Sequence, residues 1–406
     1  MTIFPANKLQ STSRRNFVTG LSVVIVAPLF GCGGGSSSNA QNEQLKEMLV
    51  ERWNAKFPGR LGSLTIHMLA PNGEFFASTN SLVTPSAHFR GASVTKTFTA
   101  ASIMLLVKSN KFKLTDKLAQ VLSIDIPYKR EIDVSQLLNH TAGVFDLVNN
   151  PVPKNNPKFP LADQYEYAGK SYLQWVTDNT ANGENHSFTK DELIGVLVDT
   201  QLYHSKPGDQ FKYSDQHYTV LGKIVEVHSG MPLNDFIATN FLSKNGLDQI
   251  NFVTDGSQWS LPAPYIRGYT IDSGSMVERE TTEYNYSYDP GSGNLVTNTA
   301  NLVRWIRKLV KGEMGLSETT INEMVTITKP STYYGLGLKR MMTPSGVMLG
   351  WGHTGGTEGY LTDAYHDPMT DVSYVLQCSL YDSSGTTEEA IWMAETALNA
   401  RNIIGY

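Results

Sequence analysis

Cysteine is scarce in this 406-residue sequence, which contains only Cys32 and Cys378. It also lacks a paired CxxC, an HExxH, a glycine-rich phosphate loop and any internal repeat. These are the short patterns by which metal sites and nucleotide sites are usually recognised. The sequence therefore contains no pattern that indicates a metal ion or any other cofactor.

Two further features are missing, an excess of positive charge and an apolar run long enough to span a bilayer. Without the three cationic residues of positions 1–31, Lys+Arg falls from 33 to 30 against 38 Asp+Glu, a formal charge of -8. This balance argues against nucleic acid as a partner. The apolar run from Leu21 to Phe30 is shorter than the about 20 residues that a membrane helix needs.

The first 31 residues have the features of an export signal. Lys8, Arg14 and Arg15 precede the apolar run and no acidic residue is present, which is typical of a signal peptide. The stretch 13–18 resembles a twin-arginine motif, and Leu29-Phe30-Gly31-Cys32 resembles a lipoprotein cleavage box. We expect residues 1–31 to be removed, Cys32 to be lipidated, and 32–41, rich in glycine and serine, to form a flexible tether. Ordinary cleavage near Gly31 with a spare cysteine is the alternative.

The remaining chain, 42–406, reads as one α+β domain. Helical spacing over 42–57 is followed by two strands within 63–78 around Pro71-Asn72-Gly73, a hairpin signal. Helices dominate from about 113 to 330, strands return from about 334 to 380, and a helix over about 387–400 ends the chain. The pattern predicts an antiparallel sheet built from both chain ends, an inserted mostly helical subdomain, and a cleft where the two meet. Cys378 lies in an alternating stretch and is expected to be a buried thiol.

Residues Gly91 to Leu106 contain the strongest candidate for a nucleophile. Ser93 and Lys96 are three positions apart, so in a helix that begins at Ser93 the amine lies beside the hydroxyl. The residues after Lys96 are apolar nearly all round, which indicates a helix buried on every side. Burial and the positive end of the helix dipole both lower the pKa of a lysine. We therefore expect Ser93 to be the nucleophile and a partly neutral Lys96 to be its base.

A second Ser-x-x-Lys stretch, from Ser187 to Lys190, provides an internal comparison. Thr189 and Glu192 have the pattern of a capping box, which places Lys190 on an exposed first turn and Ser187 outside the helix. The tetrapeptide alone is common. Agreement with other motifs in the right order is what selects Ser93.

Two later segments supply those motifs. Tyr213 stands just before a helix predicted to run to Gly230, and His353-Thr354-Gly355-Gly356 opens a strand in which glycine lets another backbone approach closely. Together with Ser93 and Lys96, and in this order, they resemble the serine β-lactamase and penicillin-binding protein family, especially its class C β-lactamase and D-alanyl-D-alanine carboxypeptidase branch. The resemblance covers about residues 45–400. Further matches are Leu137-Leu138-Asn139-His140-Thr141-Ala142-Gly143, Tyr334-Gly335-Leu336-Gly337-Leu338 and Gly293-Asn294-Leu295-Val296-Thr297.

The resemblance implies the β-lactamase/transpeptidase-like fold and a role for each matching residue. Ser93 matches the acylated serine, Lys96 its partner, and Tyr213 the tyrosine that relays protons to the leaving group and to the hydrolytic water. Asp215 stands where the family usually has the asparagine of Tyr-x-Asn, which touches the lysine and the substrate. If Asp215 reaches the cleft, its carboxylate should favour the charged Lys96 and raise the lysine's pKa, against the effect of burial; otherwise it caps the helix. A second register aligns Ser214-Asp215-Gln216 with a Ser-Asp-Asn motif, although the flanking residues favour Tyr213.

The strand motif and the oxyanion hole are implied in the same way. His353, Thr354 and Gly355 match the Lys-Thr-Gly strand, whose first two residues hold the substrate carboxylate. The backbone N–H groups of Ser93 and Gly356 match the oxyanion hole, where one donor is typically worth about 3 to 4 kcal/mol.

The implied activity is that of a serine hydrolase acting through an acyl-enzyme. The first expectation is a D-alanyl-D-alanine carboxypeptidase-like enzyme in the cell envelope, on the periplasmic side. Alternatives are a β-lactamase, a carboxylesterase or a D-amino-acid amide hydrolase of the same family. A weakly active or inactive sensor of penicillin or peptidoglycan is the alternative from another class. The polar stretches 149–170 and 284–293 either overhang the cleft or are solvated loops without a role.

The leader generates the first testable prediction. We expect Cys32→Ser to move the protein from the membrane fraction to the soluble fraction, because the lipid on Cys32 would be its only anchor there. Fractionation followed by N-terminal sequencing measures this. A wild-type protein that is already soluble and begins at another residue would contradict the anchor.

Overall fold

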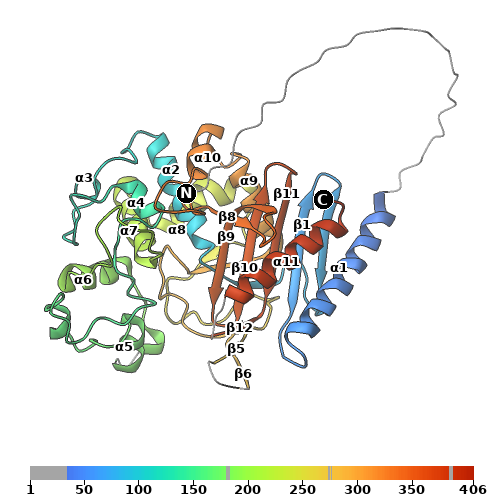
Figure 1. Ribbon diagram of the computed structural model, residues 1–406, viewed down its shortest axis with the longest axis horizontal. Helices are drawn as coiled ribbons and strands as arrows, with labels where there is room; N and C mark the ends of the chain where they lie inside the picture. The colour runs from blue at the N-terminus through green and yellow to red at the C-terminus, as the bar shows by residue number, and fades with distance from the viewer. Residues whose placement is uncertain (1–33, 180–182, 273–274, 276, 384–386) are drawn as a thin grey trace, which may run out of the picture.

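The computed structural model describes residues 34–179, 183–272, 275, 277–383 and 387–406 (Figure 1). The predicted signal peptide, its twin-arginine stretch and Cys32 lie outside these residues. Among the described helices, none is both long and apolar enough to cross a bilayer.

A six-stranded antiparallel sheet forms the larger layer, with strand order β2-β1-β11-β10-β9-β8. Its strands come from the two ends of the chain, as predicted, and the hairpin at Asn72 joins β1 to β2. Leu64 pairs with Cys378, so the first strand of the chain lies directly beside one of the last. The strands are β1 Leu64–Ala70, β2 Gly73–Ser78, β8 Lys339–Met342, β9 Met348–Thr357, β10 Tyr360–Asp367 and β11 Val372–Cys378.

Helices cover both faces of this sheet. On one face, α1 (Gly34–Lys56) and α11 (Thr387–Ile403) lie side by side (Figure 1). Their apolar side chains share a core with Cys378, which is fully buried, as predicted. On the other face, α9 (Thr299–Val310) packs against β1, β10 and β11. Because α1 begins at Gly34, residues 34–41 of the predicted tether are helical instead. Extending a helix that Leu45 and Leu49 already anchor costs less than nucleating a new one.

The predicted helical insertion is present but ends earlier than expected. Its helices lie on the left in Figure 1, whereas α9 and four short strands within 113–330 belong to the sheet side. These strands complete two small sheets, with orders β3-β7-β4 and β12-β5-β6. The inserted helices are α3 Leu118–Val121, α4 Val134–Leu138, α5 Tyr172–Asn179, α6 Lys190–Thr200, α7 Asp215–Ser229 and α8 Leu233–Ile237, with α10 Glu318–Met324 following α9; the short strands are β3 His88–Ala92, β4 Asn251–Phe252, β5 Tyr269–Ile271, β6 Glu278–Glu280, β7 Leu295–Asn298 and β12 Leu380–Asp382.

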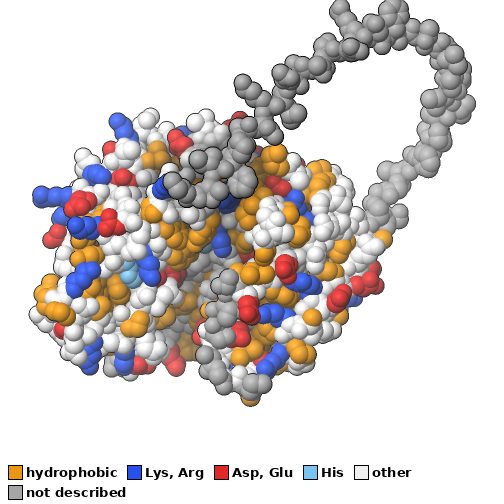
Figure 2. Space-filling view, viewed as in Figure 1, with side chains coloured by type: hydrophobic (Ala, Val, Ile, Leu, Met, Phe, Trp, Pro, Cys, Tyr) orange, Lys and Arg blue, Asp and Glu red, His pale blue; other side chains and the backbone are white. Residues whose placement is uncertain are grey.

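Helix α2 (Thr95–Lys108) joins the two parts of the molecule. All of its residues but three are buried, as its apolar sequence predicts, and it packs along α7. Phe98 on α2 stacks on Trp305 of α9 with ring centroids 3.8 Å apart, and the Trp305 indole donates a hydrogen bond to Thr97. The nucleophile segment is thus held between the helical region and the sheet. The face drawn in Figure 2 is hollowed between these two parts, and charges of both signs are interspersed over it.

Trp305 provides a test of this arrangement. Trp305→Ala should lower the free energy of unfolding by about 3 to 5 kcal/mol, since it removes a fully buried aromatic ring. The matched control is Leu82→Ala, whose side chain is 85% exposed and which should change the value by no more than about 0.5 kcal/mol. Urea unfolding measures both. Equal effects of the two substitutions would contradict the role given to Trp305.

Candidate active site

Ser93 lies in a tight turn between β3 and α2. The preceding residue, Ala92, has a left-handed φ of 46°, and a bulge interrupts the pairing of β3 with β7 there. Such a conformation costs an alanine roughly 1 to 3 kcal/mol, and residues of this kind are enriched at functional sites. The Thr95 hydroxyl stabilises the turn by donating to the Ala92 carbonyl over 2.7 Å. The helix begins at Thr95, two residues later than the sequence predicts, yet Ser93 and Lys96 still face each other.

Lys96 is fully buried and its amine has three partners. Nζ donates to Ser93 Oγ over 3.0 Å, to Asp215 Oδ1 over 2.6 Å and to the Ser292 carbonyl over 3.1 Å. An ammonium group has three hydrogens and no lone pair, so this set satisfies the charged form completely. A neutral amine would keep two hydrogens, for Asp215 and Ser292, and its lone pair would accept from the Ser93 hydroxyl.

Asp215 points at Lys96 and does not cap its helix. It is the first residue of α7, and Ser214 before it makes no side-chain cap either. Oδ1 also accepts from the Ser292 hydroxyl over 2.9 Å, while Oδ2 accepts from the Asn149 amide over 2.7 Å. Of the two alternatives that the sequence left for Asp215, the structure therefore excludes the helix cap: the side chain points toward the site, where it is buried against Lys96.

This ion pair reverses the expected state of the lysine. Burial, the largest single influence, would lower the pKa of Lys96, but the charge and hydrogen bond of Asp215, with smaller contributions from Tyr213 and Asp289, together outweigh it and hold the pKa above its usual range. Burial would raise the pKa of Asp215, yet its contact with Lys96 lowers the pKa on balance. The prediction of a partly neutral Lys96 is wrong for this reason, and the resting site contains an ammonium and a carboxylate.

Tyr213 completes the group around Ser93. The Lys96 amine lies 4.9 Å from the centre of the Tyr213 ring, which rests on the ring of His140 at 4.2 Å. Burial raises the pKa of Tyr213, and its contacts with Lys96 and Ser93 oppose this without overcoming it. Tyr213 is therefore a phenol able to donate a proton.

His353 lies in the site but is not free to bind an anion. Its Nδ1 contacts the Thr354 carbonyl at 2.6 Å, so Nδ1 carries the proton, and Nε2 accepts from the Tyr334 hydroxyl at 2.8 Å. Burial, with the nearby charge of Lys96, lowers the pKa of His353 to about 3. The ring is neutral and both of its nitrogens are occupied. The structure thus corrects the expectation that His353 holds a substrate carboxylate directly.

A lysine that the sequence patterns did not indicate, Lys339, lies beside His353. Lys339, on β8, donates to Thr354 Oγ1 over 2.9 Å, and Thr354 Oγ1 also contacts the Tyr365 hydroxyl at 2.9 Å. Burial lowers the pKa of Lys339, and the charge of Asp363 opposes this shift. Lys339 directly follows the Tyr334 to Leu338 match, but only the register of β8 on β9 brings it to the site.

A pocket of about 260 Å³ brings these groups together. It is lined by Ser93, Tyr213, Tyr333, Tyr334, Lys339, His353 and Thr354. Lys96 and Asp215 lie behind its wall. The pocket thus offers a hydroxyl nucleophile, a phenol and a cation within one small volume.

Gly355 explains how β9 reaches this pocket. A Cβ added there would lie 2.2 Å from the Gly91 carbonyl oxygen, so only glycine lets the strand approach the turn before Ser93 so closely. The next residue, Gly356, is exposed. This contact puts the backbone of β9 alongside the nucleophile, where the resemblance expects an oxyanion hole.

The remaining sequence predictions can be placed as well. Ser187 lies outside α6, whose capping box of Thr189 and Glu192 forms as expected, and Lys190 pairs with Glu226. Both polar stretches contact the site, the first through Asn149, and the second through Ser292. Among the described residues, no group of three or more His, Cys, Asp or Glu side chains is arranged to hold a metal ion.

Comparison with known proteins agrees with this geometry. A family model described as Beta-lactamase matches residues 73–397. A penicillin-binding protein of Bacillus subtilis is 26% identical, covering 70% of this chain and 57% of its own length. A putative D-alanyl-D-alanine carboxypeptidase of Salmonella paratyphi A is 25% identical, covering 61% of this chain and 63% of its own length. The chain thus spans less than two thirds of either relative.

Solved structures show the same fold at lower identity. A D-stereospecific amidohydrolase from Streptomyces sp. superposes with a TM-score of 0.68 at 22% identity, covering 88% of this chain and 98% of the other. A D-amino acid amidase from Ochrobactrum anthropi SV3, complexed with L-phenylalanine, gives a TM-score of 0.71 at 19% identity, covering 90% and 98%. The predicted α+β architecture is confirmed.

The Lys96 and Asp215 pair leads to a prediction on pH. If a neutral Lys96 accepts the proton of Ser93, the acylation rate should rise toward alkaline pH, because Asp215 holds the pKa of Lys96 high. Asp215→Asn removes that charge and should move the rising limb to lower pH by about one to three units. Burst kinetics at a series of pH values measures the rate for both proteins.

Asp146→Asn is the matched control. Asp146 is also buried and also bonded to Asn149, but no hydrogen bond links it to Lys96. Its profile should move less than that of Asp215→Asn. An unchanged profile for Asp215→Asn, or one moved to higher pH, would contradict the electrostatic argument.

Proposed function

The chain belongs to the β-lactamase family, and from this premise we propose that it is a serine hydrolase of the D-alanyl-D-alanine carboxypeptidase type, exported and held in the cell envelope by a lipid on Cys32. The substrate would be a small peptide with a free carboxylate, cleaved through an acyl-enzyme on Ser93. β-Lactamase, carboxylesterase and D-amino-acid amidase activities use the same chemistry and differ in the groups bound on either side of the reacting carbonyl.

The observation that carries this choice is the position of Lys339. It shares one pocket with Ser93 and bonds the hydroxyl of Thr354. A cation beside a hydroxyl is the arrangement that binds a carboxylate with a charge-assisted hydrogen bond. A carboxypeptidase needs such a group on the leaving side of the scissile bond, whereas a simple ester hydrolase does not.

The proton transfers during acylation follow from the charges of Lys96 and Asp215 in the resting site. Ser93 Oγ accepts a hydrogen bond from the Lys96 ammonium, so attack first requires that ammonium to lose a proton. Asp215 Oδ1, at 2.6 Å, is the nearest acceptor. Transfer along this bond leaves a neutral amine, which takes the Ser93 proton as Oγ bonds the substrate carbonyl carbon. The resulting oxyanion would be held by the N–H groups of Ser93 and Gly356.

Collapse and hydrolysis use the same groups in reverse. The carbon–nitrogen bond breaks and the leaving amine takes a proton, for which the Tyr213 hydroxyl is the proposed donor, resupplied from Lys96. A water then attacks the Ser93 ester and gives one proton to the Tyr213 and Lys96 pair. That proton passes to Ser93 Oγ as the bond between Oγ and the acyl carbon breaks and the acid leaves. Asp215 finally returns its proton to Lys96, which restores the charges of the resting site.

The Lys96 and Asp215 pair also supports a second candidate, the slowly acylating sensor. Moving a proton from a lysine with a raised pKa to an aspartate with a lowered pKa is uphill, and each pKa unit costs about 1.4 kcal/mol. Acylation is slow if nothing offsets that cost. A stable Ser93 adduct without turnover would favour the sensor.

A substrate panel with matched variants tests the proposal. The panel comprises a D-alanyl-D-alanine peptide, the same peptide with its carboxylate amidated, nitrocefin and a p-nitrophenyl ester. Lys339→Met should lower kcat/KM for the free peptide by about 10- to 100-fold, the worth of a charged hydrogen bond, and leave the uncharged ester nearly unchanged. Lys244→Met, at an exposed site, is the control for loss of a positive charge.

Two serine variants identify the nucleophile in the same assay. Ser93→Ala should abolish turnover and labelling by a fluorescent penicillin, and Ser187→Ala should preserve both. Full activity in Ser93→Ala would end the proposal. Equal loss on the peptide and on the ester in Lys339→Met would remove the carboxylate-binding role and with it the preference for a carboxypeptidase.

A further inference from the structure

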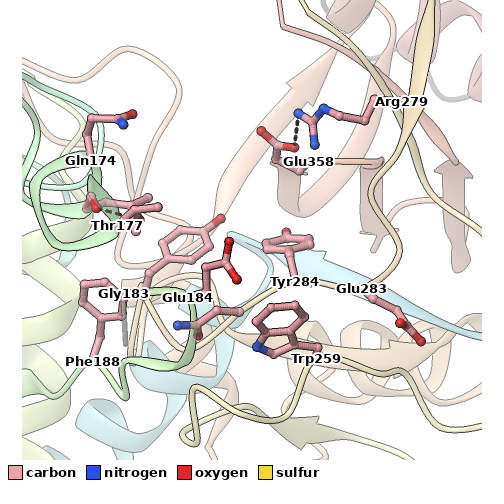
Figure 3. Close-up of a pocket in the computed structure, with 13 residues that line it drawn as sticks. Gln174, Thr177, Gly183, Glu184, Phe188, Trp259, Arg279, Glu283, Tyr284 and Glu358 are labelled. Atoms are coloured by element: carbon pink, nitrogen blue, oxygen red, sulfur yellow. Dashed lines mark hydrogen bonds and ion pairs between the residues drawn. The ribbon is translucent and has the colours of Figure 1, made fainter. Parts of the chain in front are cut away.

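A second and larger pocket lies at the C-terminal end of β9, beyond Thr357. Its volume is about 430 Å³ (Figure 3). Its wall is drawn from α5, from Gly183, Glu184 and Phe188, from the tyrosine-rich stretch and from Glu358, which follows β9 directly. It shares no lining residue with the pocket that contains Ser93 and Lys339.

Thr357 connects this pocket to the reacting centre. It is the last residue of β9 and follows Gly356, and its hydroxyl bonds the hydroxyls of Tyr284 and Tyr288, each at 2.8 Å. Both tyrosines line the larger pocket. Thr354, which accepts a hydrogen bond from Lys339 on β8, lies on the same strand three residues before Thr357. The two pockets therefore flank the place where the substrate carbonyl would sit. If the leaving group occupies the Lys339 side, the acyl group extends into the larger pocket.

The walls of this pocket are aromatic. Phe188, Trp259, Tyr284 and Tyr288 contribute rings, and the rings of Tyr284 and Tyr288 are inclined by 27° with centroids 6.5 Å apart. Aromatic faces bind apolar and aromatic groups, and they also attract cations through the ring quadrupole. The walls thus suit an acyl group with an apolar or aromatic body.

The charges of the pocket are unbalanced. Glu184, Glu283 and Glu358 line it together with one cation, Arg279, which pairs with Glu358 at 2.9 Å and with Asp272 at 3.2 Å. Glu283 accepts from the Ser260 hydroxyl, and no described residue forms an ion pair with Glu184 or Glu283. In Figure 3 the Glu184 carboxylate extends toward Tyr284. An ammonium or guanidinium group inside the pocket would face the Glu184 carboxylate, and Glu283, which also lines the pocket, adds a second negative charge.

We infer that this pocket binds the acyl part of the substrate and selects acyl groups that carry a positive charge on an apolar or aromatic body. The inference rests on the proposed function, since it takes Ser93 as the nucleophile. Glu184 and Glu283 act as specificity-determining residues, and the aromatic rings supply most of the contact area.

The experiment uses three phenylacetyl probes that differ only at the para position, where they bear an aminomethyl, an ethyl or a carboxylate group. As primary amides they are titrated by calorimetry into the full-length Ser93→Ala variant, which reports binding without turnover. As p-nitrophenyl esters they are given to the active protein. The aminomethyl probe should bind more tightly than the ethyl probe, and the carboxylate probe most weakly.

Glu184→Gln and Glu283→Gln, each made also in the Ser93→Ala background, should each reduce the preference for aminomethyl over ethyl by about threefold, as expected for partly exposed charge pairs. The preference should also shrink as salt is raised. Glu51→Gln, an exposed carboxylate on α1, is the matched control and should leave the preference unchanged.

The outcomes separate the two claims. Charge-selective binding together with esters that are not hydrolysed through Ser93 would refute the proposed function and leave the pocket's selectivity standing. Hydrolysis through Ser93 with no preference for the aminomethyl group, or a preference that both glutamine variants retain, would overturn the inference alone. Failure of all three probes to bind would overturn it as well.

Discussion

The buried contact between Lys96 and Asp215 determines the form of the whole site. A lysine with no exposure to solvent loses its hydration, a penalty of several kcal/mol that only well-placed acceptors can offset. Its three acceptors come from the turn before α2, from the start of α7 and from the stretch that ends near Gly293. One ammonium group therefore ties together three segments that are far apart in the sequence. This charge adds to the packing of α2 along α7 in fixing the position of Ser93.

The same contact sets a conflict between stability and chemistry. The geometry that satisfies the ammonium also removes the lone pair that would accept the serine proton. In the resting site Lys96 is therefore protonated and cannot act as a base. Asp215 is the main group that favours this protonated state, and it is also the nearest acceptor for the proton that Lys96 must lose. An asparagine at 215 could still bond the lysine through its amide oxygen, but it would neither hold the charge so strongly nor take the proton. The substitution of a carboxylate for the family's amide therefore changes the route of the proton, while the arrangement of the heavy atoms can stay the same.

Local patterns in the sequence were sufficient for the parts of the structure that are built locally. The hairpin at Asn72, the buried α2, the capping box at Thr189 and the helix after Tyr213 each depend on periodicity or on turn chemistry within a few residues. The order of the three motifs was enough to predict that Ser93, Lys96 and Tyr213 lie in one site.

The errors concern groups whose neighbours lie far away in the chain. The charge state of Lys96 depends on Asp215, 119 positions later, and the acceptor at Ser292 lies 196 positions from Lys96. Lys339 was missed because only the pairing of β8 with β9 carries it to the pocket, and His353 was given an anion-binding role because its partner Tyr334 was unknown.

With these long-range contacts in place, the site has opposite polarity at its two ends: a lysine beyond Thr354 and uncompensated carboxylates beyond Thr357. A substrate with a cationic acyl end and an anionic leaving end would align with this polarity in one direction only, and in the reverse direction both charges would meet like charges, which costs binding energy. The strand β9 then fixes the substrate's position through its backbone, and the charges at its two ends fix the direction in which the substrate lies.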